Sequence, residues 1–171
     1  MHKRTFVATA IATLVAVLFA ASPAGAADLN WRHFVGNGSG RCLDVDTNTN
    51  WKVQLWSCDS GADESWGLQY VGTAAGGVDF YNLVNKRTNT CLGISGDSSS
   101  SGVAAVMSAC NSGHTQWWYF PDKTGPSTRI INIWTGLCLD ARGNGTGNGT
   151  IVQQYTCNGT TAQSWKDVDV P

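Results

Sequence analysis

The side chains of this chain that could do chemistry recur in one short phrase, a cysteine followed by a leucine. The phrase reads Cys42-Leu43-Asp44, then Cys91-Leu92-Gly93, then Cys138-Leu139-Asp140. Thiols form disulfides, bind metals or attack as nucleophiles, and carboxylates accept hydrogen bonds or transfer protons. Each phrase is followed by a second cysteine and then by a tryptophan, at Trp66, Trp118 and Trp165. The first cysteines are 49 and 47 positions apart, which predicts three repeats that bury a core together.

All six cysteines fall in pairs, two to a repeat. An even count behind a secretory leader predicts a disulfide framework, and local pairing is the only connectivity that treats the three repeats alike. The predicted bridges are Cys42 with Cys58, Cys91 with Cys110, and Cys138 with Cys157. A zinc site is the competing interpretation, but there is no Cys-x-x-Cys, and only His33 and His114 follow the leader. We therefore predict no metal, no cofactor and no free thiol nucleophile.

The first 26 residues have the features of a secretory signal peptide. Lys3 and Arg4 precede an apolar stretch from Phe6 to Ala21, and Ala24-Gly25-Ala26 is a small-residue cleavage pattern. A membrane anchor is the alternative interpretation, but the stretch is short for a span and lacks a basic stop-transfer flank. We expect cleavage of residues 1–26, no membrane insertion, and a secreted, extracellular single domain over residues 27–171.

Net charge and composition argue against some classes of partner and favour one class of fold. Loss of Lys3 and Arg4 with the leader takes the formal net charge from −1 to −3, so nucleic acid is a poor candidate partner. Charged residues make up only 13% of the chain, and turn-forming polar residues are abundant. This composition is typical of a loop-rich β protein, which we expect to be monomeric.

Short runs of β-branched and aromatic residues between turn signals predict strands and no helix. The runs are 33–35, 53–56, 81–84, 104–107, 129–134 and 151–155. Asn-Gly pairs predict positive-φ turns, and 143–149 is interpreted as a hairpin tip. These pairs begin at Asn37, Asn144, Asn148 and Asn158, where they also form Asn-Gly-Ser/Thr sequons that matter only in a glycosylating host.

The segments around the second cysteines carry a more specific signature. They include Gln54-Leu55-Trp56-Ser57-Cys58, Gln153-Gln154-Tyr155-Thr156-Cys157, Gln116-Trp117-Trp118 and Gln163-Ser164-Trp165. Cys-Leu-Asp, Gln-x-aromatic-x-Cys and Gln-x-Trp resemble the ricin B-chain-type lectin family over residues 31–170. The resemblance implies an all-β, twelve-stranded β-trefoil with three pseudo-symmetric repeats, about 31–78, 79–127 and 128–171, each with one disulfide. It also implies that each repeat can hold one shallow sugar pocket.

For repeat three, the resemblance assigns Asp140 as hydroxyl acceptor, Tyr155 as stacking platform, and Gln153 and Gln163 as amide partners. A carboxylate forms charge-assisted hydrogen bonds to hydroxyls, and an aromatic ring covers the C–H face of a sugar with few rotamers to freeze. The family often has a hydrogen-bonding asparagine where this chain has Ala162. We expect that change to weaken the site by one hydrogen bond, ~0.5–1.5 kcal/mol.

Repeat one offers Asp44, Gln54, Trp56 and Asp63 in the equivalent positions, but Glu64 replaces the glutamine of Gln-x-Trp. Two interpretations follow. In the first, Glu64 faces Asp44, so that one carboxyl pKa rises and the pair shares a proton or recruits a cation. In the second, Glu64 points to solvent, as glutamates usually do.

Repeat two lacks the site residues, because Gly93, Val106 and Ser108 stand where the aspartate, glutamine and aromatic residue are expected. We interpret it as a structural unit. The tryptophan and leucine of each repeat phrase are predicted to be core, since they persist where the site is gone. Four tryptophans remain unassigned: Trp31, Trp51, Trp117 and Trp134.

These patterns predict a secreted, lectin-like protein that binds mono-, oligo- or polysaccharides of the galactosyl or xylan type through repeats one and three. We predict no enzyme, because a glycosidase needs two tuned carboxylates. Glu64 is the only glutamate. A retaining pair of Glu64 with Asp44 or Asp63 is conceivable, but we expect the pocket to be shallow and wet, which works against raising the pKa of a carboxyl group. An interaction or inhibitor protein is the alternative, using the loops Gly72–Gly77 or Gly96–Gly102. Those loops look flexible, whereas inhibitory loops need rigidity. A glycoside hydrolase ranks below both.

Overall fold

The computed structural model describes residues 29–48, 51–122 and 124–170, so the predicted signal peptide lies outside the described residues. Twelve strands form one connected antiparallel sheet, and the helical segments of this part of the chain are 3-10 turns of three residues. The strands are β1 Arg32–Gly36, β2 Cys42–Asp46, β3 Lys52–Trp56, β4 Trp66–Ala74, β5 Val78–Asn85, β6 Cys91–Ile94, β7 Val103–Ser108, β8 Trp118–Tyr119, β9 Ile131–Asn132, β10 Cys138–Ala141, β11 Thr150–Tyr155 and β12 Trp165–Asp169. The turns are η1 Ser95–Asp97, η2 His114–Gln116, η3 Arg142–Asn144 and η4 Thr161–Gln163. The predicted all-β class is confirmed.

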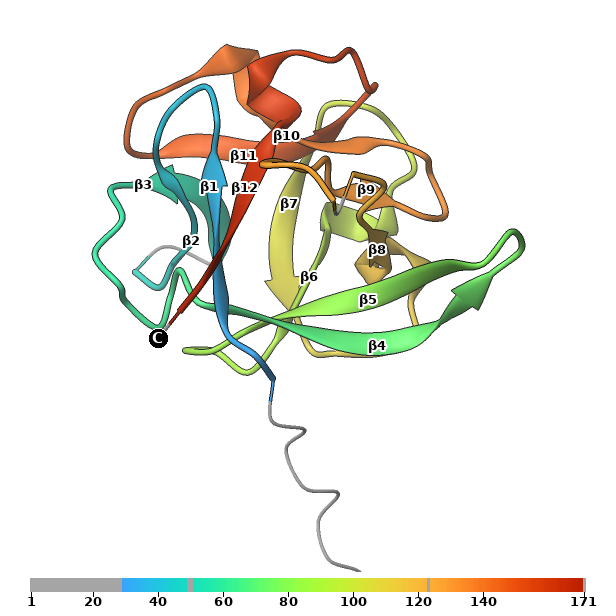
Figure 1. The fold of residues 1–171 in the computed structure, drawn as a ribbon. Helices are drawn as coiled ribbons and strands as arrows, with labels where there is room; N and C mark the ends of the chain where they lie inside the picture. The colour runs from blue at the N-terminus through green and yellow to red at the C-terminus, as the bar shows by residue number, and fades with distance from the viewer. Residues whose placement is uncertain (1–28, 49–50, 123, 171) are drawn as a thin grey trace, which may run out of the picture.

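Six of the strands make a closed ring. β1 pairs with β12 and β4, β5 pairs with β4 and β8, and β8 pairs with β9. Thr128, shortly before β9, bridges to Trp165 of β12 and completes the circuit. Because β1 and β12 are partners, the two ends of the described fold lie together, while the long β4–β5 hairpin projects from the body (Figure 1).

The other six strands form three hairpins, β2–β3, β6–β7 and β10–β11. Their second strands pair with one another, β3 with β7, β7 with β11, and β11 with β3. Three hairpins joined in a triangle beside a six-stranded ring make a β-trefoil-like fold. The exact repeat boundaries stay a prediction.

The tryptophans of the three repeat phrases hold ring and hairpins together. Each is fully buried, and its indole N–H donates to the carbonyl of the phrase leucine. The pairs are Trp66 to Leu43 at 2.8 Å, Trp118 to Leu92 at 2.9 Å and Trp165 to Leu139 at 3.1 Å. The leucines are buried too, so these six residues are core, as predicted. Buried polar N–H groups need such partners, and the three bonds supply them in equivalent places.

The three predicted disulfides are present, Cys42 to Cys58, Cys91 to Cys110, and Cys138 to Cys157. In each, one cysteine begins the first strand of a hairpin and the other follows the second strand. In repeats one and three the bridge therefore fastens the hairpin end next to the aspartate and the aromatic residue of the candidate site, each of which lies two positions from a bridge cysteine.

One of the turn predictions needs correction. Asn144, Gly149 and Gly159 have positive φ, but at the pair Asn37-Gly38 the positive φ belongs instead to Gly40. Gly38 is required for space, since a Cβ there would lie 2.7 Å from Thr161 Oγ1.

The serine run 96–102, expected to be loose, is tied to β11. Gln154 Nε2 donates to the carbonyls of Ser98 and Ser100 at 2.8 and 2.9 Å, and the amide of Thr156 donates to Ser101 Oγ. Gln154 is fully buried. The run is therefore part of the packed structure of repeats two and three.

Candidate functional site

Repeat three holds its aspartate between two amides. Asp140 and Gln153 are opposite one another in the β10–β11 ladder, and Gln153 Nε2 donates to Asp140 Oδ1 at 2.8 Å. Gln163, which arrives from η4, donates through Nε2 to Asp140 Oδ2 at 3.0 Å. Asp140 is only 4% exposed. Two neutral amide donors thus orient a nearly buried carboxyl group.

Gln163 also positions the loop that follows β11. Its Oε1 accepts the amide of Asn158 at 2.8 Å, and its Nε2 donates to the carbonyl of Thr156 at 3.0 Å. The side chain is fully buried, so it acts as a bridge between the loop and Asp140.

The carboxylate borders an open pocket of about 360 Å³, the repeat-three pocket. Its lining comprises Asp140, Arg142, Gly143, Asn144, Gln153, Tyr155 and Asn158. Tyr155 is 41% exposed, so its ring is available at the pocket. Ala162, expected to mark a lost hydrogen bond here, instead belongs to the hydrophobic core and does not line this pocket.

Repeat one repeats the arrangement in β2 and β3. Asp44 lies opposite Gln54, and Gln54 Nε2 donates to Asp44 Oδ1 at 2.8 Å. Beside them is the repeat-one pocket, about 310 Å³, lined by Asp44, Val45, Asp46, Thr47, Asn48, Gln54, Trp56, Asp59 and Asp63. Trp56 is 43% exposed. The equivalent carboxylate, amide and ring are therefore together in both repeats.

Glu64 is where the two repeats differ. It is only 2% exposed, which overturns the interpretation that it points to solvent. Its Oε1 accepts the backbone amides of Asp59, Ser60 and Gly61. Glu64 thus holds the loop as Gln163 does, but a carboxylate has no N–H to offer Asp44. Within the described residues Asp44 accepts one hydrogen bond, from Gln54, where Asp140 accepts two.

Asp44 is consequently hard to ionise. Burial raises the pKa of its carboxyl from 3.8 to about 6; the Gln54 hydrogen bond opposes this rise, and the nearby charges of Asp63, Glu64 and Asp46 add to it. The sequence predicted a raised carboxyl pKa here from the Glu64 substitution. The larger cause is the removal of Asp44 from water.

Repeat two presents neither carboxylate nor ring at the equivalent place. Gly93 lies opposite Val106 and Cys91 lies opposite Ser108. Gln116 Nε2 turns to Ser108 Oγ at 2.7 Å, and its Cγ would be 3.1 Å from a Cβ on Gly93. The Gln-x-Trp glutamine here serves its own loop.

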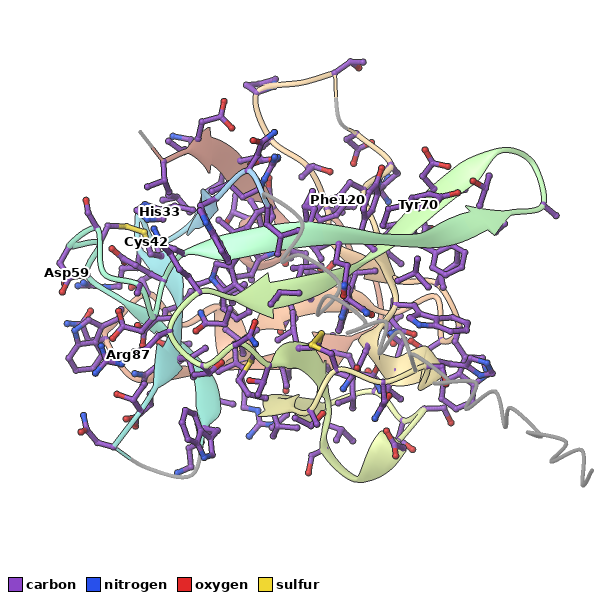
Figure 2. The ribbon with its side chains drawn as sticks, turned by 90° about the horizontal axis from the view of Figure 1, so that it is seen from below. His33, Cys42, Asp59, Tyr70, Arg87 and Phe120 are labelled. Carbon is purple, nitrogen blue, oxygen red and sulfur yellow. A yellow bond between two sulfur atoms is a disulfide. The ribbon has the colours of Figure 1, made fainter. Side chains whose placement is uncertain are left out.

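One group of potential metal ligands occurs among the described residues, formed by His33, Cys42 and Glu64 with atoms within 4.8 Å of one another. Figure 2 shows His33 beside Cys42. Because the Cys42 sulfur is bonded to Cys58, it is no thiolate and cannot complete a metal site. None of the described helical segments is long and apolar enough to cross a membrane.

Comparison with protein families identifies the family to which the chain belongs. The model of the ricin-type beta-trefoil lectin domain-like family matches residues 27–108, 69–150 and 114–170. The chain belongs to this family. Membership of the ricin-type lectin-like family supports carbohydrate binding as the class of function. A search of curated proteins finds no match to the chain.

Solved structures show the same fold. This ricin-type domain is similar to a designed threefold-symmetric protein, ThreeFoil, with 26% identity and a TM-score of 0.75, over 82% of this chain and 99% of that one. It resembles an exo-β-1,3-galactanase from Clostridium thermocellum at 26% identity and a TM-score of 0.77, over 84% and 31% of the two chains. A Macrolepiota procera ricin B-like lectin in complex with lactose has 20% identity and a TM-score of 0.67, over 82% and 95%.

Sequence reasoning missed several residues that line the pockets of this ricin-type domain. Arg142 donates to Gln153 Oε1 at 2.7 Å and to the Gly102 carbonyl at 2.9 Å, so it braces the amide that holds Asp140. Asn158 lines the same pocket, and Asp46 and Asp59 line the repeat-one pocket. Their closeness in sequence to Asp140, Cys157, Asp44 and Cys58 was the available signal.

Proposed function

We propose that this protein is a secreted lectin that binds galactosyl or xylan-type glycans through the repeat-one and repeat-three pockets. The observation that carries the proposal is an aspartate held by a glutamine amide beside an exposed aromatic ring. That arrangement occurs twice on one scaffold, at Asp44 and at Asp140, with 2.8 Å hydrogen bonds in both places.

The chemistry of a sugar matches this arrangement. A hexose or pentose has one face of C–H groups, which suits the ring of Trp56 or Tyr155, and hydroxyls that donate to a carboxylate. Each ring is about two-fifths exposed and each aspartate is nearly buried, so a ligand can cover the ring while reaching the carboxylate at the pocket wall. Open pockets of this kind suit one or two sugar units.

We propose binding without hydrolysis. Glu64, the only glutamate, is buried and its Oε1 is occupied by three backbone amides, so it is poorly placed to donate a proton to a glycosidic oxygen. The galactosyl part of the proposal is supported by the likeness to the galactanase. Because the match covers 31% of that chain, the hydrolytic activity of the whole galactanase is not carried over.

Calorimetry with lactose and xylotriose tests the proposal. In an Asp44→Ala background, Asp140→Ala and Tyr155→Ala should each remove the remaining binding, because the first deletes the hydroxyl acceptor and the second the platform. Asp79→Ala on the β4–β5 hairpin is the matched control. Unchanged affinity in both double variants would exclude these pockets, and inhibition of proteases without sugar binding would favour the inhibitor alternative.

A further inference from the structure

The two pockets share a scaffold but differ in charge. Four of the nine residues lining the repeat-one pocket are aspartates, Asp44, Asp46, Asp59 and Asp63, and none of the nine is basic. The repeat-three pocket combines Asp140 with Arg142 and is otherwise neutral. With all these groups ionised, the formal charge of the lining is −4 in repeat one and zero in repeat three. A ligand that fits both pockets sterically will therefore meet a strongly negative lining in repeat one and a neutral one in repeat three.

Three of the four aspartates, Asp44, Asp59 and Asp63, keep their negative charge without an ion-pair partner among the described residues. The ion pairs between Arg32 and Asp167 and between Arg129 and Asp122 do not involve these three aspartates. Asp59 Oδ1 accepts a hydrogen bond from an uncharged donor, the amide of Gly61, at 2.8 Å.

The groups around the pocket add little positive charge. Glu64 lies behind it and adds a further carboxylate, with His33 of β1 close to Glu64. Lys52 lies opposite Asp46 in the β2–β3 ladder, yet it does not line the pocket. The balance of charge facing the pocket is therefore strongly negative.

We propose that the repeat-one pocket selects amino sugars, whose protonated 2-amino group enters the aspartate cluster while the pyranose ring lies on Trp56. The proposal rests on the proposed function, because it takes for granted that this pocket binds a sugar. The two pockets would then bind different sugars, because the repeat-three pocket, with Arg142 at its wall, remains suited to neutral glycans.

Three features of an ammonium group fit this pocket better than a hydroxyl does. It donates up to three hydrogen bonds and accepts none, so it satisfies several carboxylates at once. Its hydrogen bonds to carboxylates are charge-assisted and therefore stronger. It is also attracted to the face of an exposed tryptophan. An N-acetyl group has none of these properties, and a uronate would be repelled.

The replacement of glutamine by Glu64 also favours an amino sugar at this pocket. Asp44 lacks the second amide donor that Gln163 gives to Asp140, which leaves Asp44 able to accept a further donor from the ligand. Since the pKa of Asp44 is about 6, affinity for a cationic sugar should rise as the pH increases through 6 and Asp44 ionises.

The test uses two trimers of the same length, chitotriose with three free amines and its fully N-acetylated form. Calorimetry is carried out at pH 7 on the protein with repeat three silenced by Asp140→Ala and Tyr155→Ala. We expect chitotriose to bind at least about tenfold more tightly than the acetylated trimer, and added salt to reduce the difference. Trp56→Ala should weaken both trimers.

Charge-removing variants locate the preference. Asp59→Asn and Asp63→Asn should each lower chitotriose affinity about threefold to tenfold, with no change in melting temperature that indicates misfolding. Asp79→Asn removes the same charge from the β4–β5 hairpin and should change nothing. Figure 2 shows Tyr70 of that hairpin on the opposite side of the view from Asp59.

The outcomes separate this inference from the proposed function. Equal affinity for the two trimers, or equal competition by spermidine, which has amines but no ring, would overturn selection of amino sugars. Lactose or xylotriose binding to the unmodified protein would in that case still support a lectin. Failure of lactose, xylotriose and both trimers to bind would overturn the proposed function and this inference together.

Discussion

Asp44 and Asp140 occupy equivalent strand positions, yet their surroundings give them different chemistry. Both accept a 2.8 Å hydrogen bond from a glutamine on the neighbouring strand. Asp140 accepts a second hydrogen bond, from the amide of Gln163. The equivalent Glu64 accepts hydrogen bonds from backbone amides and has no N–H to donate to Asp44. The two repeats thus differ at one side chain, an amide in repeat three and a carboxylate in repeat one, and the charge of Glu64 adds to the burial that raises the pKa of Asp44 to about 6.

Stability should therefore depend on the protonation of Asp44. Its pKa is higher in the folded protein than its ordinary 3.8, so the fold favours the protonated carboxyl and loses that advantage as the pH rises through 6. We expect the free energy of unfolding to fall by up to about 3 kcal/mol between about pH 4 and pH 7 from this residue. Urea denaturation of the wild type against Asp44→Asn checks this, since the variant lacks that part of the pH dependence.

A companion variant tests the cause. Glu64→Gln restores an amide that can donate to Asp44 and removes a neighbouring negative charge, so the pKa of Asp44 should fall toward 3.8. A carboxyl carbon titration followed by NMR measures it directly. If the pKa of Asp44 in this variant stays at about 6, burial alone sets it and Glu64 has no part in tuning the site.

The aromatic platforms should contribute to binding but little to folding. Trp56 and Tyr155 are 43% and 41% exposed, so replacing either with alanine leaves the core intact. We expect each change to weaken sugar binding at its own pocket by about tenfold, the equivalent of ~1.4 kcal/mol, with the melting temperature nearly unchanged. Tyr70→Ala, at a residue 58% exposed on the projecting hairpin, is the matched control. A loss of folding rather than affinity would contradict this division of roles.

At the scale of elements, each hairpin is fastened to the ring by one indole. Trp66, Trp118 and Trp165 begin strands of the ring and donate to leucine carbonyls on the first strands of the hairpins. Since the same bond occurs in repeat two, where the site residues are absent, it serves the architecture. The strand register within each hairpin places the aspartate opposite its glutamine. The indole hydrogen bond therefore helps to position the site, because it fixes the hairpin against the ring.

Removal of one such bond should therefore cost stability without touching the pockets. Trp118→Phe keeps an aromatic ring in the core but leaves the buried Leu92 carbonyl without the indole donor. We expect a loss of about 1–3 kcal/mol in the free energy of unfolding, measured by urea denaturation. Trp134→Phe, at a residue 50% exposed, should change stability very little. An equal change in the free energy of unfolding in both variants would show that the indole hydrogen bond does not contribute to stability.

For the whole molecule, the disulfides and the core divide the work of holding three small repeats together. Each bridge closes a short loop, with sequence separations of 16, 19 and 19 residues. None of the repeats is large enough to bury a core alone, and the side chains of all three meet in one hydrophobic cluster. The disulfides reduce the conformational entropy of the unfolded chain. Burial of apolar side chains between the repeats stabilises the closed ring of strands.

Loss of the repeat-two disulfide should lower the stability of the whole domain. In the variant Cys91→Ala with Cys110→Ala, we expect the free energy of unfolding to fall by about 3 kcal/mol, as loop-closure entropy predicts for a loop of this length. Sugar binding by the folded fraction should persist, because both pockets lie in other repeats. Chemical denaturation and calorimetry on the same sample measure the two effects, and a loss of binding without unfolding would contradict the independence of the pockets.

The sequence by itself determined the features that depend on local spacing. The cysteine pairs and the buried tryptophans and leucines follow from a period of about 48 residues. The resemblance to the lectin family implied that Gln54 and Gln153 belong to the sites of Asp44 and Asp140. These features lie within one repeat, so a single pattern written three times is enough to find them.

The tertiary structure decided what depends on contacts between loops. It showed that Glu64 is buried against the amides of Asp59 to Gly61, that Arg142 braces Gln153, and that Ala162 belongs to the core. The sequence placed Asp44 and Asp63 in one site, and the structure adds Asp46 and Asp59 to the same pocket. Direction of a side chain, access of water and distance between charges are set by the packed chain, because the Coulomb interaction and the cost of burial depend on three-dimensional position.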